Sequence, residues 1–198
     1  MTSSSIRVVS RSRDARAGRN ALLLVLILVS LAVALRAGTA AEITDMLSRR
    51  VPVPERPMRI VSLAPSITET IFVLGEGERL VGVTDYCDYP PEATKKPRVG
   101  GISTPSFEAI VALRPDLVLA TSESNYAEHV QRLAALGLPV YVIRPVDFET
   151  VLESIERIGV VLGQEEAARA RVTSMRLEAD AIARAVAGSP RPRAGAAR

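Results

Sequence analysis

The sequence has one cysteine, one histidine and no tryptophan among its 198 residues. A single cysteine, Cys87, excludes an internal disulfide and a cluster of thiolate metal ligands, and we expect its thiol to be inert. The single histidine, His129, is predicted to lie on the exposed face of a helix. Neither a nucleophile with a histidine partner nor a histidine-based zinc site can therefore be assembled.

Nucleotide-binding and hydrolase motifs are also missing. The chain contains neither a P-loop nor a G-x-S-x-G elbow. Residues 75–80 (GEGERL) follow a helical pattern and precede a strand pattern, which is the reverse of the order in a dinucleotide fingerprint. Together with the histidine count, these absences predict a protein that is not an enzyme and that carries no metal and no cofactor.

Residues 1–41 have the three-part layout of a secretory signal peptide. A basic leader precedes an uncharged apolar run that begins at Ala21 and ends at Leu35, and small residues follow it. The run is shorter than the ~20 residues of a membrane span, so we expect cleavage near residues 39–41. A retained membrane anchor is the alternative. No cysteine directly follows the run, which excludes a lipid anchor, and the protein is predicted to be exported to the periplasm or cell envelope.

The net charge of +3 is set by the leader. Residues 1–41 hold six of the 25 basic residues and one of the 22 acidic residues, so the remainder is slightly acidic. The charge therefore does not indicate nucleic acid as a partner. Residues 42–58 are polar and then rich in proline (VPVPERP), which predicts an extended lead-in.

Short β-rich runs alternate with helical patterns in residues 59–146. The strand runs are residues 59–64, 80–83, 116–120 and 140–143, and the helical patterns are residues 66–74, 106–113 and 126–136. Strands that alternate with helices predict parallel strands joined by crossovers, and the runs are apolar throughout, as buried parallel strands require. We expect an α/β lobe of three layers, with helices on both faces of a parallel sheet.

The end of the chain has a different pattern. Asp147 can cap a helix that runs to Gly163, and residues 164–186 have the composition of a second, longer helix. Residues 147–187 are therefore predicted to form a helix pair. Residues 188–198 (GSPRPRAGAAR) have no apolar face and are predicted to be disordered.

Open α/β sheets bind ligands beyond the carboxyl ends of their strands. This rule places one rim at Pro65 and Ser66, the loop 85–91, the turn 100–105 and residues 122–126. Ser66 also begins the pattern S-x-x-E, which predicts that its side chain caps the following helix, while the free N–H groups of that helix could face an anionic ligand.

Two of the four tyrosines fall in the loop 85–91. Flat amphipathic rings on a loop suit contact with a large, partly apolar ligand. We predict such a contact for Tyr86. Tyr89 precedes two prolines and is predicted to pack the loop against the domain.

Three stretches carry a family resemblance. Residues 59–90 (RIVSLAPSITETIFVLGEGERLVGVTDYCDYP), 96–120 (KPRVGGISTPSFEAIVALRPDLVLA) and 133–159 (LAALGLPVYVIRPVDFETVLESIERIG) together resemble the amino-terminal lobe of substrate-binding proteins of bacterial ABC importers. The subfamily is the one for cobalamin, iron-siderophores and haem, and the resemblance covers roughly residues 59–186.

The resemblance implies two α/β lobes joined by one long helix, with a bulky ligand between the lobes that is delivered to an ABC permease. Residues 164–186 would be the linking helix, and the second lobe would be absent. We therefore expect a truncated or frameshifted product, or else a single-lobe protein, and in either case a monomer. A lone lobe supplies one wall of the cleft, so weak ligand binding is expected.

The resemblance also implies roles for individual residues. Tyr86 matches the tyrosine that stacks on the corrin ligand of cobalamin binders. Ile102 and Thr121 fall where that subgroup has two further aromatic contacts, and neither is aromatic here. With Pro65 and Ser66 of the rim, these residues are the predicted ligand-binding set, for a cobalamin-like or ferric siderophore ligand.

Glu108 matches an exposed glutamate by which this lobe docks onto arginines of the permease. A carboxylate in the first turn of a helix is also favoured by the helix dipole, by ~0.3–1 kcal/mol, and both roles are compatible. The alternative function is an exported or membrane-anchored single-lobe module that binds a protein partner. Retention of the run from Ala21 to Leu35 in the mature protein would favour this alternative.

Overall fold

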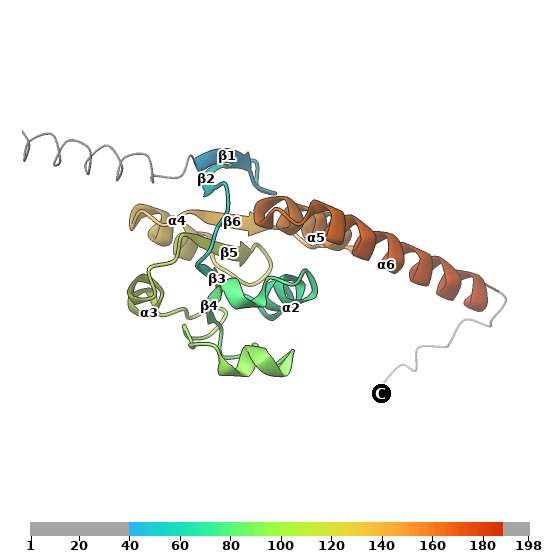
Figure 1. Ribbon diagram of the computed structural model, residues 1–198, viewed down its shortest axis with the longest axis horizontal. Coiled ribbons are helices and arrows are strands. Elements are labelled where there is room, and N and C mark those ends of the chain that lie inside the picture. The colour runs from blue at the N-terminus through green and yellow to red at the C-terminus, as the bar shows by residue number, and fades with distance from the viewer. Residues whose placement is uncertain (1–39, 188–198) are drawn as a thin grey trace, which may run out of the picture. The chain divides into compact units, whose positions relative to one another are not determined.

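A four-stranded parallel sheet lies at the centre of residues 40–187, which are the residues that this computed structural model describes (Figure 1). The strand order is β4-β3-β5-β6, and each neighbouring pair is parallel. The strands are β3 (Ile60–Ser62), β4 (Leu80–Val83), β5 (Leu117–Thr121) and β6 (Val140–Ile143). The predicted α/β fold with a parallel sheet is confirmed.

Within the described residues, four helices pack on this sheet and a fifth, α6, packs on α5. They are α2 (Pro65–Val73), α3 (Phe107–Ala112), α4 (Ala127–Ala135), α5 (Phe148–Leu162) and α6 (Glu165–Val186), with the short 3-10 helices η1 (Gly77–Arg79) and η2 (Pro91–Lys95) between strands. The long carboxy-terminal helix predicted for residues 164–186 is α6. The predictions for residues 1–39 and 188–198 lie outside the described residues.

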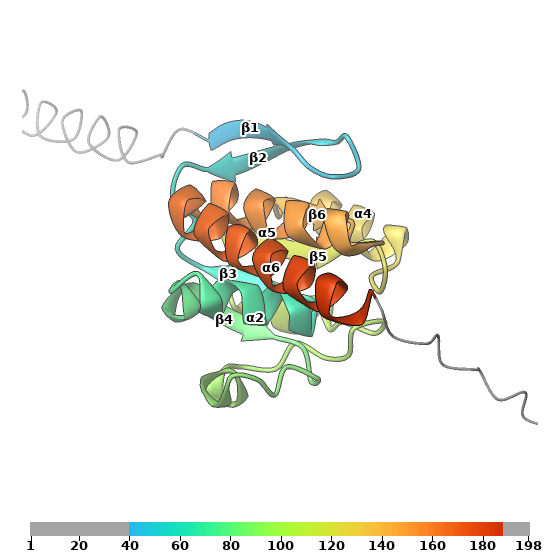
Figure 2. The same ribbon diagram turned by 90° about the vertical axis from the view of Figure 1, so that its right-hand side faces the viewer.

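Alternate residues of each strand enter two separate cores, because successive side chains of a strand point to opposite faces. In β5, Leu117 and Leu119 join the core under α2, α5 and α6, whereas Val118 and Ala120 join the core under α3 and α4. Figure 1 shows these two groups of helices on opposite sides of the strands, and Figure 2 shows α2, α5 and α6 in front of the sheet. The three-layer prediction is confirmed.

The start of α2 differs from the predicted capping box. The helix begins at Pro65, one residue before Ser66, and Ala64 is its N-cap without a side-chain hydrogen bond. Proline suits the first helical position because its fixed φ fits the helix and its missing N–H leaves no donor unpaired. Ser66 is therefore inside the first turn, where its carbonyl accepts a hydrogen bond from the Thr70 hydroxyl (2.8 Å). The predicted capping role of Ser66 is wrong.

The start of α5 agrees with the prediction. The Asp147 carboxylate accepts a hydrogen bond from the Thr150 N–H (2.8 Å), and the Thr150 hydroxyl accepts one from the Asp147 N–H (2.9 Å). The N–H of Thr150 and its hydroxyl, which also donates to the carboxylate (2.8 Å), hold the pKa of Asp147 below its usual value. Gly163 ends the helix in the left-handed conformation at φ 69°, which glycine adopts without steric cost.

An antiparallel hairpin, β1 (Ala40–Thr44) and β2 (Arg50–Pro54), covers the outer edge of β6. The N–H of Met46 donates to the carbonyl of Val142 (3.1 Å). Much of the segment expected to be an extended lead-in is thus a hairpin with a docked turn. An exposed strand edge would offer unpaired N–H and C=O groups to other chains, and the turn occupies them.

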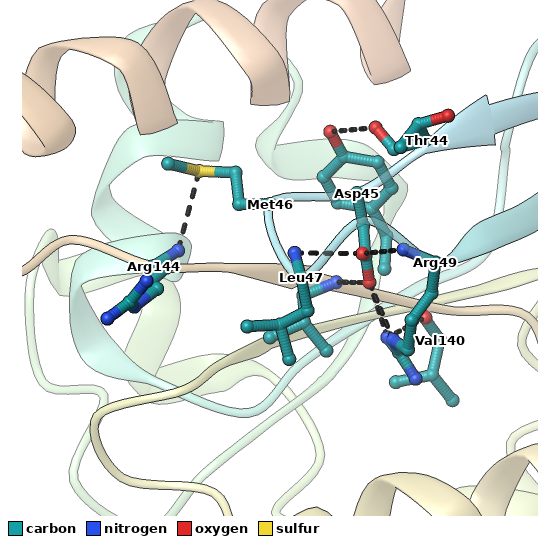
Figure 3. A network of polar contacts seen from close by, with 9 residues as sticks. Thr44, Asp45, Met46, Leu47, Arg49, Val140 and Arg144 are labelled. Atoms are coloured by element: carbon teal, nitrogen blue, oxygen red, sulfur yellow. Dashed lines mark hydrogen bonds and ion pairs between the residues drawn. The ribbon is translucent and has the colours of Figure 1, made fainter.

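The carboxylate of Asp45 organises this docked turn (Figure 3). It accepts hydrogen bonds from the N–H groups of Leu47 (3.0 Å), Arg49 (2.9 Å) and Val142 (3.3 Å). The guanidinium of Arg49 pairs with the same carboxylate and donates to the carbonyl of Val140 (3.0 Å). The Tyr141 hydroxyl lies close to the Thr44 carbonyl (3.4 Å), and burial raises the pKa of that phenol.

The opposite edge of the sheet is covered by residues 97–99. The N–H of Val83 donates to the Pro97 carbonyl and the N–H of Val99 donates to the Val83 carbonyl, each at 3.0 Å. The outer edges of β4 and β6 are thus each partly covered by another segment of the chain. The two hydrogen bonds of Val83 also fix the segment that leads into the turn at residues 100–105.

We predict that Asp45→Ala lowers the free energy of unfolding by about 2–4 kcal/mol, because the buried N–H of Val142 and the N–H groups of Leu47 and Arg49 in the docked turn lose their acceptor. The matched control is Arg50→Ala, which breaks an exposed ion pair with Glu42 worth at most ~1 kcal/mol. Urea unfolding measures both. A smaller loss for Asp45→Ala than for Arg50→Ala would show that the docked turn does not stabilise the lobe.

Candidate functional site

The candidate site lies at the carboxyl ends of β3 and β5, which are neighbours in the centre of the sheet. The chain leaves β3 into α2 on one face and leaves β5 toward α4 on the other face. A parallel sheet opens a crevice where neighbouring connections diverge in this way, and such crevices bind ligands. The loops that follow β3, β4 and β5 form the surface around this point, and we call them the rim.

Cys87 anchors the tyrosine-containing loop that follows β4. Its side chain is fully buried, and its sulfur lies 3.2 Å from the Thr68 hydroxyl and 3.1 Å from the Thr84 hydroxyl. The guanidinium of Arg98 donates to the carbonyls of Thr84 (2.6 Å) and Cys87 (2.9 Å). The loop is therefore held at its root, and the residues on either side of Cys87 face outward.

Tyr86 and Tyr89 are both exposed, at 63% and 64% of their surface. The predicted packing of Tyr89 against the domain is therefore wrong, because Cys87 and Arg98 hold the loop without it. Tyr86 lies next to the neighbouring turn, since a β-carbon built on Gly101 would be 3.8 Å from the Tyr86 ring edge. Tyr86 is the tyrosine that joins the loop to the rest of the rim.

The turn at residues 100–105 has a backbone that requires glycine. Gly100 has φ 92°, and a β-carbon there would lie 2.8 Å from the Thr104 carbonyl oxygen. The carbonyl of Gly100 accepts a hydrogen bond from the N–H of Asp85 (3.0 Å), and Ser106 donates its N–H to Val99 (2.8 Å). The base of the turn is thus fixed to the tyrosine loop, and Ile102 lies at its tip.

The sequence interpretation assigned no role to Asn125, whose side chain connects three parts of the rim. Its oxygen accepts a hydrogen bond from the N–H of Thr121 (2.9 Å), and its nitrogen donates to the carbonyls of Leu63 (3.2 Å) and Ile102 (2.9 Å). Asn125 is 6% exposed. The available sequence signal was an asparagine placed just after a buried strand, which favours a local turn rather than these distant contacts.

The predicted ligand-binding residues lie in the first turn of α2 (Pro65 and Ser66), in the loops after β4 (Tyr86 and Ile102) and at the end of β5 (Thr121). Pro65 and Ile102 are half-buried and Ser66 is exposed. Thr121 is 4% exposed, and its hydroxyl oxygen lies 3.4 Å from the N–H of Glu123. Tyr86 is 63% exposed and has the largest side chain of the set, so it offers the largest contact surface.

Glu108 is exposed in the first turn of α3. Ser106 caps this helix by accepting a hydrogen bond from the N–H of Ala109 (3.2 Å). Because α3 starts directly after the turn at residues 100–105, the carboxylate of Glu108 lies beside the rim. Glu108 therefore occupies the predicted position in the first turn of the helix, where the helix dipole favours a negative charge, and its carboxylate is accessible.

His129 is not on an exposed helix face, and that prediction is wrong. Its side chain is 16% exposed and lies edge-on to Phe107 (5.6 Å between ring centroids) and to Tyr126 (5.3 Å). Phe107 comes from α3, so the helical pattern of α4 alone could not reveal this contact. Within residues 40–187, no group of three or more His, Cys, Asp and Glu residues is arranged to hold a metal ion.

Comparisons with known proteins agree with this architecture. Residues 60–195 match the family described as periplasmic binding protein. The chain belongs to the periplasmic binding protein family. It is a family of binding proteins rather than enzymes, and the resemblance predicted from the sequence is confirmed.

Relatives of this periplasmic binding protein by sequence include the following two. An uncharacterised ABC transporter substrate-binding lipoprotein of Bacillus subtilis is 38% identical over 137 residues, which are 68% of this chain and 43% of that protein. A vitamin B12-binding protein of Photorhabdus laumondii is 32% identical over 61% of this chain and 44% of its own length. The chain thus spans less than half the length of these relatives.

Solved structures of the family show the same fold. The vitamin B12-binding protein of Vibrio cholerae superposes with a TM-score of 0.63 at 30% identity, over 68% of this chain and 53% of that structure. A haem-binding protein of Pseudomonas aeruginosa gives 0.62 at 30% identity, over 69% and 50%. The chain thus covers about half of each of these structures, as a single α/β lobe would. Across those residues, no helix is both long and apolar enough to cross a bilayer.

We predict that Cys87 reacts with a maleimide dye at least ~100-fold more slowly in the native protein than in urea, because its labelling requires the loop to open. The chain has one cysteine, so the dye reports on this position alone. The control is the double variant Cys87→Ser with Tyr89→Cys, which moves the thiol to an exposed position and should label rapidly. Equal native rates for the two proteins would contradict the anchoring role.

Proposed function

We propose that this periplasmic binding protein captures a bulky, partly apolar ligand of the cobalamin or ferric siderophore type and delivers it to an ABC permease. The observation that carries the proposal is the ring of Tyr86, exposed on a rim loop that is anchored against α2 and the end of β4. A rigidly held, exposed aromatic ring binds the face of a large planar ligand at low entropic cost.

Relatives and structural neighbours support this ligand class. They include proteins named for binding vitamin B12 and haem, which are large macrocycles with extended faces. Pro65, Ser66, Ile102 and Thr121 complete the proposed contact set around Tyr86. Because Ile102 and Thr121 are not aromatic, Tyr86 carries most of the stacking, and the ligand is otherwise held by aliphatic and hydroxyl groups.

The described residues provide one wall of a binding site. Sites that grip drug-sized ligands bury most of the ligand surface. We therefore expect a Kd for cyanocobalamin above about 1 µM for this chain.

Delivery would use Glu108, whose carboxylate is exposed beside the rim in the first turn of α3. A carboxylate there is available to pair with arginines of a permease, since α3 itself needs only Ser106 for its cap. We further propose that residues 1–41 direct export, so that the protein works in the periplasm or cell envelope. The binding proteins named among its relatives support this location.

The apolar end of α6 favours a second candidate function, the binding of a protein partner. Leu177, Ile182 and Val186 are exposed to 63%, 65% and 56%, although a helix end usually presents polar residues to water. Retention of the segment from Ala21 to Leu35 in the mature protein, measured by mass spectrometry of the isolated envelope fraction, would favour this candidate. Cleavage of the segment would favour the importer.

We predict that Tyr86→Ala weakens cyanocobalamin binding about tenfold, which is the loss of ~1.4 kcal/mol of aromatic contact. Equilibrium dialysis with cyanocobalamin, and separately with haemin, measures the Kd. The matched control is Tyr89→Ala, which removes an equally exposed ring from the same loop and should change the Kd less than twofold. Equal losses of affinity in the two variants would show that Tyr86 has no specific role in binding.

We predict that Glu108→Lys reduces cyanocobalamin uptake at least ~10-fold in cells that carry the cognate permease, because a like charge faces the permease arginines. Binding measured by dialysis should be unchanged. Glu156→Lys makes the same charge change at another exposed position on α5 and should leave uptake intact. Normal uptake with Glu108→Lys would exclude the docking role.

A further inference from the structure

Asn125 occupies the point where the ladder between β3 and β5 stops. The last hydrogen bond of this ladder runs from the N–H of Leu63 to the carbonyl of Leu119 (3.0 Å). In a parallel ladder the next bond would join the N–H of Thr121 to the carbonyl of Leu63. Here the carboxamide of Asn125 is inserted between these two groups, accepting from Thr121 (2.9 Å) and donating to Leu63 (3.2 Å).

The third hydrogen bond of Asn125 reaches across the crevice. Its nitrogen also donates to the carbonyl of Ile102 (2.9 Å), at the tip of the turn 100–105. The other fixed contacts of that turn are at its base, through Gly100 and Ser106, while at the tip the Ser103 hydroxyl lies 3.4 Å from the Ser124 carbonyl. The position of the Ile102 side chain relative to β5 is therefore set mainly by Asn125.

Only a carboxamide satisfies this arrangement. Two of the three partners are carbonyl oxygens and one is an N–H, so the side chain must offer two donors and one acceptor. A carboxylate of the same shape has no donor and would face two carbonyl oxygens in a buried position. At 6% exposure, water has little access to replace the missing bonds, and loss of a partner costs the desolvation of each buried group.

We propose that Asn125 is a positioning residue of the ligand-binding rim: it wedges the central crevice open and fixes the turn that carries Ile102 beside Tyr86. This inference rests on the proposed ligand-binding function. Asn125 acts through Ile102 and through Gly101, the neighbour of the Tyr86 ring, and not by touching the ligand.

The test compares Asn125→Asp with Gln131→Glu in the full chain. Both variants convert an amide to a carboxylate on or next to α4, and Gln131 is exposed. We expect the backbone amide of Thr121 to exchange with deuterium at least ~10-fold faster in Asn125→Asp, because its acceptor is displaced. We also expect cyanocobalamin binding to weaken about tenfold. Gln131→Glu should change neither quantity.

A double variant separates positioning from a general loss of stability. If Asn125 acts through the rim, Asn125→Asp combined with Tyr86→Ala should weaken binding by less than the product of the single losses, because both changes disable one contact surface. Asn125→Ala, which leaves room for a water, serves as the second variant if Asn125→Asp does not fold. Its Kd should rise in the same direction.

Three outcomes overturn the proposal. Faster Thr121 exchange with an unchanged Kd would make Asn125 a purely structural residue. If the losses of affinity multiply fully in the double variant, Asn125 does not act on the same contact surface as Tyr86. Absence of any binding of cyanocobalamin or haemin by the unmodified chain would overturn the proposed function itself, and the positioning role with it, which the first two outcomes would not do.

Discussion

The early end of β3 is the constraint on which the candidate site depends. β3 has three residues and β5 has five, so the two strands stop pairing while β5 continues to Thr121. The chain then leaves β3 toward α2 on one face of the sheet and leaves β5 toward α4 on the other face. The two connections diverge because the core on each face must be covered by its own helices. A crevice at this point leaves backbone groups without ladder partners, and the side chain of Asn125 supplies the missing bonds.

In the loop after β4, neighbouring side chains also point in opposite directions, one into the core and one out to the surface of the rim. Cys87 turns inward and fills a polar niche between two threonine hydroxyls, so its neighbour Tyr86 must face outward. The loop is thereby rigid at its root and exposed at its rings. Such an arrangement suits recognition of a large ligand face, because little backbone entropy of the loop remains to be lost on binding.

Much of the fold could be predicted from the sequence, because buried parallel strands need continuous apolar runs and surface helices need a period of 3.6 residues. The predicted bounds of β4 and β6 coincide with those observed, and the cap of α5 at Asp147 was predicted correctly. The rule that parallel strands end at one edge also placed the loop of Tyr86 and the turn of Ile102 on a common rim. These features depend on residues close together in the chain.

Tertiary structure alone decided the rest, because the deciding contacts join residues far apart in the chain. Asp45 docks its hairpin on Val142, 97 positions away, and the prolines nearby gave no sign of such pairing. His129 is covered by Phe107 from another helix. Asn125 reaches Leu63 and Ile102 across 62 and 23 positions. The sequence by itself determined the strands of the central sheet, the helices that cover it and the loops of the rim, whereas the hairpin of β1 and β2 and the distances between the loops were set by buried hydrogen bonds that exist only once the two cores have packed.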